Sequence, residues 1–349
     1  MPVFVEALGG RPLLARKQHT LAHGAAVQAI RIALVNNMPD AALEDTELQF
    51  FDLLDAASGD VPVVVKLYSL TGVPRGDRGM RRLNSFYYGL DDLWNTQVDA
   101  MIMTGTEPQQ ANLRHEPYWC NLASVLDWAE RNTVSTVLSC LAAHAGVLHS
   151  DGIERHRLGD KRFGVFEFPA AADDALTRSM GVAIRFPHSR WNEVRADALE
   201  SGGYTILTQS AEAGVDCFVK RKKQSLFVHF QGHPEYQAHT LFKEYRRDIK
   251  RFLRHERETY PTAPVGYFGE EATRCLMGFQ HKANANRSEE VMTDFPETFL
   301  TGSLQNGWHA SAVKVYRNWL TLISEKKTEM FSYAPVKVRR SGNTLQWIE

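Results

Sequence analysis

Short apolar segments that alternate with helical patterns dominate the first half of this chain, and they constrain its fold more than any other feature. The apolar segments are Ile32 to Val35, Val61 to Tyr68, Ala100 to Met103 and Val134 to Leu138. Helical spacing of apolar residues is found between them, from Glu44 to Leu54 and from Leu122 to Arg131. Strands that are apolar on both faces are typical of a parallel sheet with helices packed on each side. The sequence therefore predicts an α/β fold with a mostly parallel central sheet and helices on both faces.

The second half of the chain has a different pattern, in which strands follow one another without long helices between them. These segments are Tyr204 to Leu207, Val215 to Val219 and Ser225 to Phe230. The basic run Lys220 to Lys223 lies between the last two and predicts a solvated hairpin turn.

The remaining regions are less regular. We expect a long basic helix from Gln237 to His255 and a polar loop from Asn284 to Glu289. The chain divides into an irregular or helical N-terminal arm (residues 1–30), one large domain (residues 31–325) and a weakly patterned C-terminal tail (residues 326–349).

Charge and cysteine content exclude several classes of protein. The formal net charge is −1 and 23% of the residues are charged, so the chain lacks the basic excess of a nucleic-acid-binding or membrane-surface protein. None of the four cysteines forms a C-x-x-C pair, which is typical of free thiols in a reducing compartment. Residues 1–28 lack a signal-peptide pattern, and no apolar run approaches the ~20 residues of a membrane span. We expect a soluble cytoplasmic protein.

Cys140 is the candidate nucleophile of the predicted sheet. Ligands of open parallel sheets bind at the carboxyl ends of the strands, so Met38-Pro39, Thr104-Gly105 and Ser139-Cys140 should converge on one site. Cys140 also joins an apolar strand to a helix rich in small residues, and such an elbow lifts a side chain out of the sheet. The helix N-terminus favours a thiolate and can hold an oxyanion. The alternative is a buried thiol of the core.

A candidate base follows the last apolar segment of the second half. His233 and Glu235 are separated by one proline, a spacing that lets a carboxylate support an imidazole and fix its tautomer. With Cys140 they make a nucleophile, a base and an orienting group. Three alternatives stay open. A histidine beside a glutamate in a loop could be surface structure. His144, one helical turn after Cys140, could be the base, or His229, His233 and Glu235 could bind a metal, although no H-E-x-x-H pattern is present. We favour the acid–base interpretation and expect no metal.

A series of short segments carries further residues in a characteristic order. They are Asn37 to Pro39, Leu83 to Tyr87, Thr104-Gly105, Tyr118-Trp119, Ser139-Cys140, Phe186 to Arg190, Gly232 to Tyr236, Arg247-Asp248, Gly266 to Phe268 and Asn318 to Leu320. In this order the chain resembles the homoserine O-succinyltransferase/O-acetyltransferase family of methionine biosynthesis, from about Ile32 to Trp319. The resemblance implies a flavodoxin-like fold of the class I glutamine amidotransferase type, with a nucleophile elbow at Cys140. Residues 31–325 would then be the acyltransferase domain.

The resemblance also implies a route through an acyl-cysteine. Cys140 would take the acyl group from an acyl-CoA, with His233 as general base and Glu235 supporting it, and the hydroxyl of L-homoserine would then accept the acyl group. The positions that match the family's amino-acid-binding residues are Lys161, Ser189 and Arg247. Acyl-CoA is a co-substrate, and no bound cofactor is implied. We expect small-molecule substrates, no nucleic acid or membrane partner, and the homodimer common in the family.

Two positions depart from the family pattern. After Met38-Pro39 the family usually carries lysines, one of them assigned to the oxyanion, whereas this chain has Asp40-Ala41-Ala42. The position that separates succinyl from acetyl donors is Gln109 here, which matches neither form. The donor therefore stays open, with succinyl-CoA as the first choice and acetyl-CoA as the second.

Two alternative functions stay open as well. One is an amide hydrolase like the glutamine amidotransferases, and the other is a non-enzymatic binding or regulatory paralogue.

Overall fold

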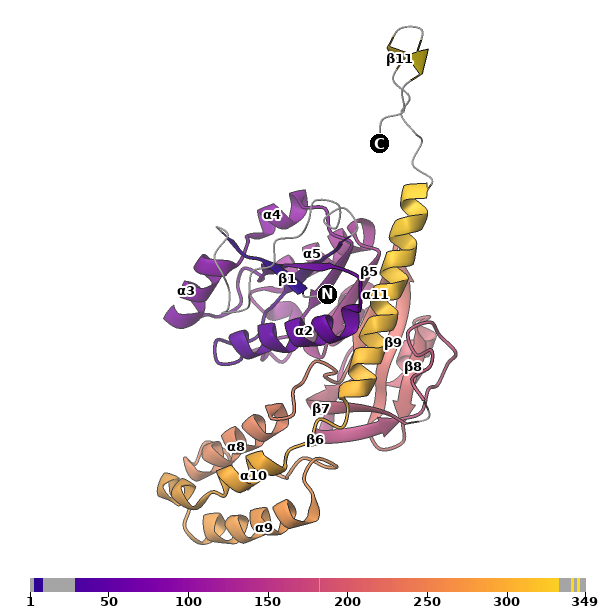
Figure 1. Ribbon diagram of the computed structural model, residues 1–349. Coiled ribbons are helices and arrows are strands. Elements are labelled where there is room, and N and C mark those ends of the chain that lie inside the picture. Colours follow the sequence, from indigo (N-terminus) through magenta and orange to yellow (C-terminus); the bar gives the residue numbers. More distant parts are fainter. Residues whose placement is uncertain (1–2, 9–28, 182, 333–339, 342–343, 346–349) are drawn as a thin grey trace.

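One twisted sheet forms the centre of the molecule (Figure 1). The computed structural model describes residues 3–8, 29–181, 183–332, 340–341 and 344–345. In spatial order the strands of the sheet are β1 (Val3–Glu6), β3 (Val63–Tyr68), β2 (Ile30–Val35), β4 (Ala100–Met103), β5 (Ser135–Ser139), β10 (Ser225–Phe230), β9 (Gly214–Lys222) and β8 (Thr205–Ser210). Neighbours from β1 to β10 are parallel, and β9 pairs antiparallel with both β10 and β8. This topology confirms the predicted α/β fold with a mostly parallel sheet.

Helices cover both faces of the sheet. The main ones are α2 (Leu43–Ser58), α11 (His309–Ser332), α5 (Trp119–Asn132) and α6 (Leu141–Asp151). α2 and α11 contact each other on one face, in an apolar core that includes Ile32 and Leu34 of β2. α5 and α6 pack in a second core that includes the intervening residues Ala33 and Val35. Successive residues of β2 therefore point into opposite cores, as expected for a strand buried on both sides.

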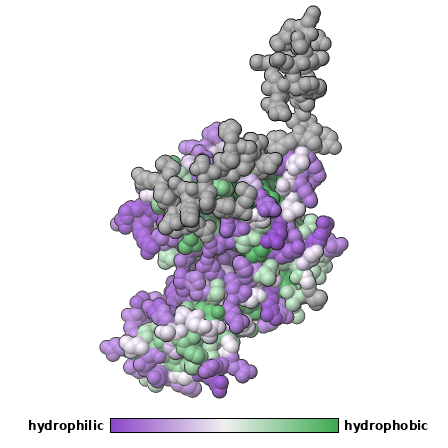
Figure 2. All heavy atoms as spheres, in the orientation of Figure 1, coloured by the Kyte–Doolittle hydropathy of each residue, from purple (hydrophilic) through white to green (hydrophobic). Residues whose placement is uncertain are grey.

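A long hairpin and a helical lobe extend from the sheet. The hairpin consists of β6 (His156–Phe168) and β7 (Ile184–Glu193), and the lobe of α8 (Thr240–Leu253), α9 (Glu270–Ala285), η3 (Glu289–Asp294) and α10 (Glu297–Ser303). The lobe has an apolar core of its own and lies below the sheet in Figure 1. Figure 2, in the same orientation, shows green apolar residues between purple hydrophilic ones on the lobe. The other described elements are α3 (Asp77–Phe86), α4 (Leu90–Asn95), η2 (Leu113–His115), α7 (Ala196–Ser201), β11 (Arg340–Ser341) and β12 (Thr344–Leu345).

The predicted strands and helices are confirmed with small shifts of their ends, but two connections differ. β9 continues to Lys222, because Lys220 and Lys222 both bind the Asp151 carboxylate, with Nζ–O distances of 2.7 and 2.9 Å. The predicted turn over the basic run is therefore wrong, and only residues 223 and 224 connect β9 to β10. The expected loop after residue 284 is also shorter, since α9 ends at Ala285 and η3 begins at Glu289.

The two ends of the chain also differ from the prediction. Val3–Glu6 form the edge strand β1 rather than an irregular or helical arm, because this apolar segment pairs in parallel with β3. The rest of the predicted arm, residues 9–28, lies outside the described residues. α11 continues to Ser332, and Lys327 within it donates to the Asp99 carboxylate at 2.7 Å. The weakly patterned tail predicted from residue 326 therefore begins inside a helix. The division into arm, domain and tail stays a prediction.

The described helices were also searched for membrane spans. Within the described ranges, none combines the length and the apolar character that a bilayer crossing requires. α11, the longest of them, mixes charged and apolar residues along its length.

Candidate active site

Cys140 occupies the elbow that its sequence pattern predicts. β5 ends at Ser139, α6 begins at Leu141, and the backbone of Cys140 between them has φ 52° and ψ −109°. A positive φ is strained for a residue with a Cβ. Backbone hydrogen bonds hold it there, since the Cys140 N–H donates to the Phe230 carbonyl at 2.7 Å and the Cys140 carbonyl accepts from Ala143 at 3.0 Å. The side chain is partly exposed, so the alternative of a buried core thiol is wrong.

The neighbouring strand ends converge on this elbow, as predicted. The Asn37 side chain and backbone N–H donate to the carbonyl and hydroxyl oxygens of Thr104, at 3.0 and 2.8 Å. Gly105 lies against the first residue of α6: a Cβ built on it would be 2.5 Å from the Cβ of Leu141 and 3.0 Å from its backbone nitrogen. This approach requires glycine, because any side chain would push the helix away from the strand ends.

His233 and Glu235 form the buried pair that the His-Pro-Glu spacing predicts. The Glu235 Oε1 atom lies 2.8 Å from His233 Nδ1, and it also accepts a hydrogen bond from Ser139 Oγ at 3.0 Å. Burial lowers the pKa of His233, but the charges of Cys140 and Glu235 and hydrogen bonds to both outweigh burial and raise that pKa well above its usual value. The structure therefore joins nucleophile, imidazole and carboxylate in one interacting set.

A glycine and a buried polar cluster fix the position of His233. The His233 N–H donates to the Pro187 carbonyl at 2.8 Å, and the preceding Gly232 N–H donates to Asp216 Oδ1 at 3.2 Å. His188 Nε2 lies 3.1 Å from the same carboxylate oxygen. A Cβ on Gly232 would come within 2.7 Å of both Asp216 Oδ1 and His188 Nε2. The close packing leaves room only for glycine before the base.

The two alternatives for the base and the metal are not supported by the geometry. His144 is buried beneath the elbow, its Nε2 lies 2.9 Å from Gln231 Oε1, and burial lowers its pKa to about 3. His229 stacks on the Phe218 ring at 4.6 Å, and burial lowers its pKa to about 3 as well. Both are therefore neutral core histidines. The described residues contain no group of three His, Cys, Asp or Glu side chains arranged to hold a metal.

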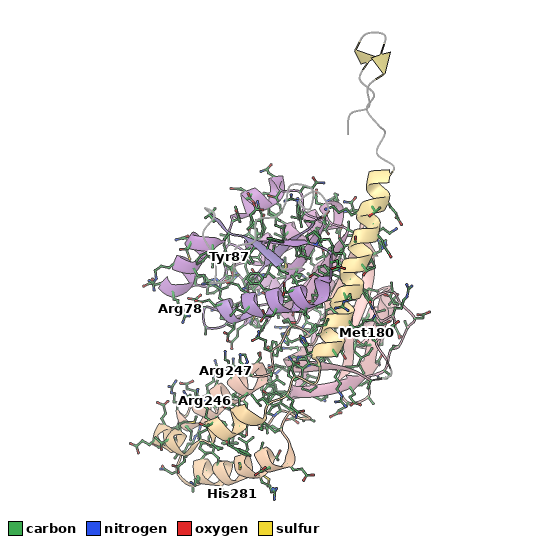
Figure 3. All side chains as sticks on the ribbon, in the orientation of Figure 1. Arg78, Tyr87, Met180, Arg246, Arg247 and His281 are labelled. Atoms are coloured by element: carbon green, nitrogen blue, oxygen red, sulfur yellow. The ribbon has the colours of Figure 1, made fainter. Side chains whose placement is uncertain are left out.

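Lys161, Ser189 and Arg247 come together around two acidic residues of α8. Lys161 Nζ lies 3.4 Å from Glu244 Oε2 and 3.3 Å from Asp248 Oδ2. The Ser189 hydroxyl donates to Glu244, and Arg247 pairs with Asp248 at 3.1 Å. Figure 3 shows Arg247 on the side of the helical lobe that faces the sheet. The three residues come from β6, β7 and α8, so the hairpin and the lobe build this cluster jointly.

Tyr236 connects the charged cluster to the base. Its ring stacks on the His233 imidazole, with centroids 4.2 Å apart, and its hydroxyl donates to Glu244 Oε1 at 2.7 Å. Burial raises the pKa of Glu244, but Lys161 and hydrogen bonds from Ser189 and Tyr236 outweigh it and lower that pKa. Glu244 therefore stays ionised as the shared acceptor of the cluster. Sequence reasoning missed it, although its position three residues before Arg247 on one helix was a usable signal.

Gln109 and Asp40, the two departures from the family pattern, have different surroundings. Gln109 is exposed, and its backbone N–H and that of Gln110 both donate to Glu116 Oε1 at 2.7 Å. Asp40 Oδ2 accepts from the backbone N–H groups of residues 76 and 79, at 2.9 and 3.1 Å, and Asp40 pairs with Arg75 at 3.5 Å. Asp40 therefore caps the N-terminus of α3, a structural role that a lysine could not fill.

Comparison with known proteins adds the family. Residues 12–330 match the family described as "Homoserine O-succinyltransferase". A protein of that name from Rhodopseudomonas palustris is 45% identical over 302 residues, which cover 86% of this chain and 90% of the relative. Another from Methylorubrum extorquens is 43% identical over 297 residues, 85% of this chain and 88% of the relative. Among solved structures, a glutamine amido transferase from Methylobacillus flagellatus gives a TM-score of 0.47 at 14% identity, over 84% of this chain and 95% of that one.

Proposed function

The chain belongs to the homoserine O-succinyltransferase family, and on this premise we propose that it moves a succinyl group from succinyl-CoA to the hydroxyl of L-homoserine, in methionine biosynthesis. The observation that carries the proposal is the direct connection between a reactive cysteine–histidine pair and a charged cluster suited to an amino acid. Tyr236 makes that connection, because it stacks on His233 and donates to Glu244.

Acylation is the first step. The raised pKa of His233 favours an imidazolium beside Cys140. The attacking form of the cysteine is the thiolate, because it is the nucleophilic form. The sulfur attacks the thioester carbonyl, an S–C bond forms, and the bond to the CoA sulfur breaks. The imidazolium gives its proton to the departing CoA thiolate, which leaves a neutral His233 beside an acyl-cysteine.

Transfer to the acceptor is the second step. The homoserine hydroxyl attacks the acyl-cysteine carbonyl while neutral His233 takes the hydroxyl proton. The new ester bond forms as the S–C bond breaks, and Cys140 leaves as a thiolate beside an imidazolium. Glu235 stabilises that imidazolium through the 2.8 Å contact with its Nδ1.

Backbone groups at the elbow replace the missing lysine. Asp40 cannot stabilise an oxyanion, because it is an acid engaged at the N-terminus of α3. The first N–H groups of a helix have no acceptor within the helix, and those of α6 begin at Leu141, directly after the nucleophile. Gly105 lies against Leu141 and leaves no side chain beside this helix end. Backbone N–H groups of this kind form the oxyanion holes of acyl-transfer enzymes.

The charged cluster suits a zwitterionic amino acid. Arg247 is about half exposed, so its guanidinium is accessible to a substrate carboxylate and can bind it with two donors. Glu244 and Asp248 provide the negative charge that an ammonium group needs. Ser189 binds Glu244 and lies on β7 two residues after Pro187, whose carbonyl accepts from the His233 N–H, so it can guide the acceptor hydroxyl.

Mass spectrometry of the intact protein tests the proposal. Mixed with succinyl-CoA in the absence of homoserine, the protein should gain one succinyl group on Cys140 and release an equal amount of CoA. Adding homoserine should remove the group, and Cys140→Ala should never acquire it. Glutamine hydrolysis without any CoA release would instead favour an amide hydrolase, and an unmodified Cys140 with every acyl-CoA would favour a binding or regulatory paralogue.

A further inference from the structure

A half-buried arginine without a partner lies near the nucleophile. Arg155 follows α6, the helix that begins directly after Cys140. In the part of the chain that the structure describes, its guanidinium has no hydrogen-bond or ion-pair partner. The neighbouring Arg114, in contrast, pairs with Glu154 at 3.4 Å and donates to the Leu148 carbonyl at 3.3 Å. A partly desolvated cation without an acceptor is costly, so the position indicates an anion that is absent from the free protein.

The surroundings of Arg155 place it near Cys140, the residue that would carry the acyl group. Burial lowers the pKa of Arg155. Three groups interact electrostatically with the guanidinium and oppose this shift in its pKa, which places them within electrostatic reach of it: Tyr118, Cys140 and Glu116. Tyr118 also belongs to the same buried cluster as Leu141, the residue that follows the nucleophile. The guanidinium therefore lies within electrostatic reach of both the phenol and the reactive sulfur, near the first turn of α6.

Two buried polar atoms of this region have no partner either. Tyr118 and Glu116 are 3% and 4% exposed as residues, and neither the Tyr118 hydroxyl nor Glu116 Oε2 has a hydrogen-bond partner among the described residues. Buried tyrosine hydroxyls usually find an acceptor. Burial raises the pKa of Tyr118 well above its usual value, so the hydroxyl keeps its proton and is a donor. A cation and a neutral hydrogen-bond donor that both lack an acceptor can together bind a carboxylate.

Glu116 limits the charge of this region but does not occupy the donors. Its Oε1 accepts from the backbone of Gln109 and Gln110, which orders the loop that carries the predicted donor-specificity position. Its charge offsets part of that of Arg155 without a direct ion pair. A ligand carboxylate is therefore held mainly by directed hydrogen bonds.

We propose that Arg155 and the Tyr118 hydroxyl bind the free carboxylate of a dicarboxylic acyl group carried on Cys140. This inference rests on the proposed function and deepens it, because it makes the enzyme selective for succinyl over acetyl donors. In a succinyl group three C–C bonds of ~1.5 Å separate the two carboxyl carbons by roughly 4 Å. Hydrogen bonds of ~3 Å then extend the reach to donors beside the elbow. An acetyl group has no carboxylate to offer.

Three donors and matched variants test the inference. Succinyl-CoA and butyryl-CoA have the same number of acyl carbons and differ in the terminal carboxylate, and acetyl-CoA is the shorter donor. The variants are Arg155→Met, Arg155→Lys, Tyr118→Phe, and Arg114→Gln as the control, because Arg114 is a nearby arginine with its own partner. The measurement is kcat/KM for CoA release with each donor, together with acylation of Cys140 by mass spectrometry and a thermal melt of each variant.

Arg155→Met should lower kcat/KM for succinyl-CoA by roughly 10- to 100-fold, as expected for lost charge-assisted hydrogen bonds, and leave the butyryl-CoA value within about 2-fold. Tyr118→Phe should lower the succinyl-CoA value by about 5-fold, and Arg155→Lys should recover part of the loss. Arg114→Gln should keep the succinyl-to-butyryl ratio of the wild type.

Two results would overturn the inference. One is that Arg155→Met lowers kcat/KM equally for all three donors. The other is that the succinyl-to-butyryl ratio of kcat/KM is unchanged in both Arg155→Met and Tyr118→Phe. If Arg155→Met fails to fold, Tyr118→Phe and Arg155→Lys decide by the same ratio. A wild-type protein that no donor acylates would overturn the proposed function itself, and this outcome is distinct because it is seen before any variant is made.

Discussion

Replacing Glu235 by glutamine tests the central pair of the site with almost no change of shape. The Glu235 Oε1 atom accepts from His233 Nδ1 at 2.8 Å and from Ser139 Oγ at 3.0 Å, and an amide oxygen can accept both bonds. The other carboxylate oxygen is buried and has no partner in the described part of the chain, so the amide NH₂ group would replace an atom that makes no hydrogen bond there. The substitution therefore removes the charge and keeps the geometry.

The expected magnitude follows from burial. The side chains of His233 and Glu235 are 8% and 4% exposed, so solvent screens their interaction very little. A hydrogen bond to a charged group contributes about 1.5–3 kcal/mol, which corresponds to a roughly 10- to 150-fold loss in the rate of Cys140 acylation. Although burial lowers the pKa of His233, the charges of Cys140 and Glu235 raise it, so losing one of them lowers that pKa relative to the wild type. His233 then loses its proton at a lower pH, and the alkaline limb of the profile of acylation rate against pH should shift to lower pH.

Single-turnover acylation by succinyl-CoA, followed across pH by release of CoA thiol, measures both effects. Glu167→Gln is the matched control, because Glu167 pairs with Arg185 on the exposed surface of the β6–β7 hairpin. The control should keep the wild-type rate and profile. A Glu235→Gln protein with an unchanged rate and an unchanged alkaline limb would refute the argument that this carboxylate supports the base.

Three further predictions concern neighbouring parts of the site. Tyr236→Phe keeps the ring on His233 but removes the 2.7 Å bond to Glu244, so KM for homoserine should rise about 5- to 10-fold in steady-state assays while donor-only acylation is unchanged. Asp40→Asn keeps an acceptor at the N-terminus of α3 but removes its charge, and should lower the free energy of unfolding by about 0.3–1 kcal/mol in urea titrations, with kcat retained. Cys140→Gly should unfold at higher urea than Cys140→Ala, because only glycine relieves the strain at φ 52°, worth about 1–3 kcal/mol, while both are inactive.

Local patterns predicted the geometry around Cys140, and the family resemblance favoured Cys140, His233 and Glu235 as the reacting residues. The elbow at Cys140 follows from an apolar strand that meets a helix of small residues, and both elements are continuous in sequence. His233 and Glu235 are two residues apart, so one turn determines their contact. The core-facing strands were equally readable, since residues buried on both faces leave a continuous apolar run. Lys161, Ser189 and Arg247, in contrast, were predicted only through the family resemblance.

Long-range packing explains what the pattern could not predict. Glu244 binds Ser189 and Lys161, which lie 55 and 83 residues away, and only the fold of the β6–β7 hairpin against α8 brings them together. The edge strand Val3–Glu6 is four residues long and finds its place through pairing with β3. Arg155 has no local signature at all, because its distinguishing feature is the absence of a partner among the residues that the structure describes. Such features depend on tertiary structure rather than on periodicity.

Strand register explains why nucleophile and base meet. β5 and β10 are parallel neighbours, and their register pairs Ser139 with Phe230, so both strands leave the sheet at the same level. The next residue of one is Cys140, whose N–H donates to the Phe230 carbonyl, and the other leads within three residues to His233. A one-residue slip would turn every side chain of β10 to the opposite core and is excluded by burial on both faces. The packing of two apolar strands therefore sets the separation of sulfur and imidazole, and Glu235 reinforces it by binding Ser139 as well as His233.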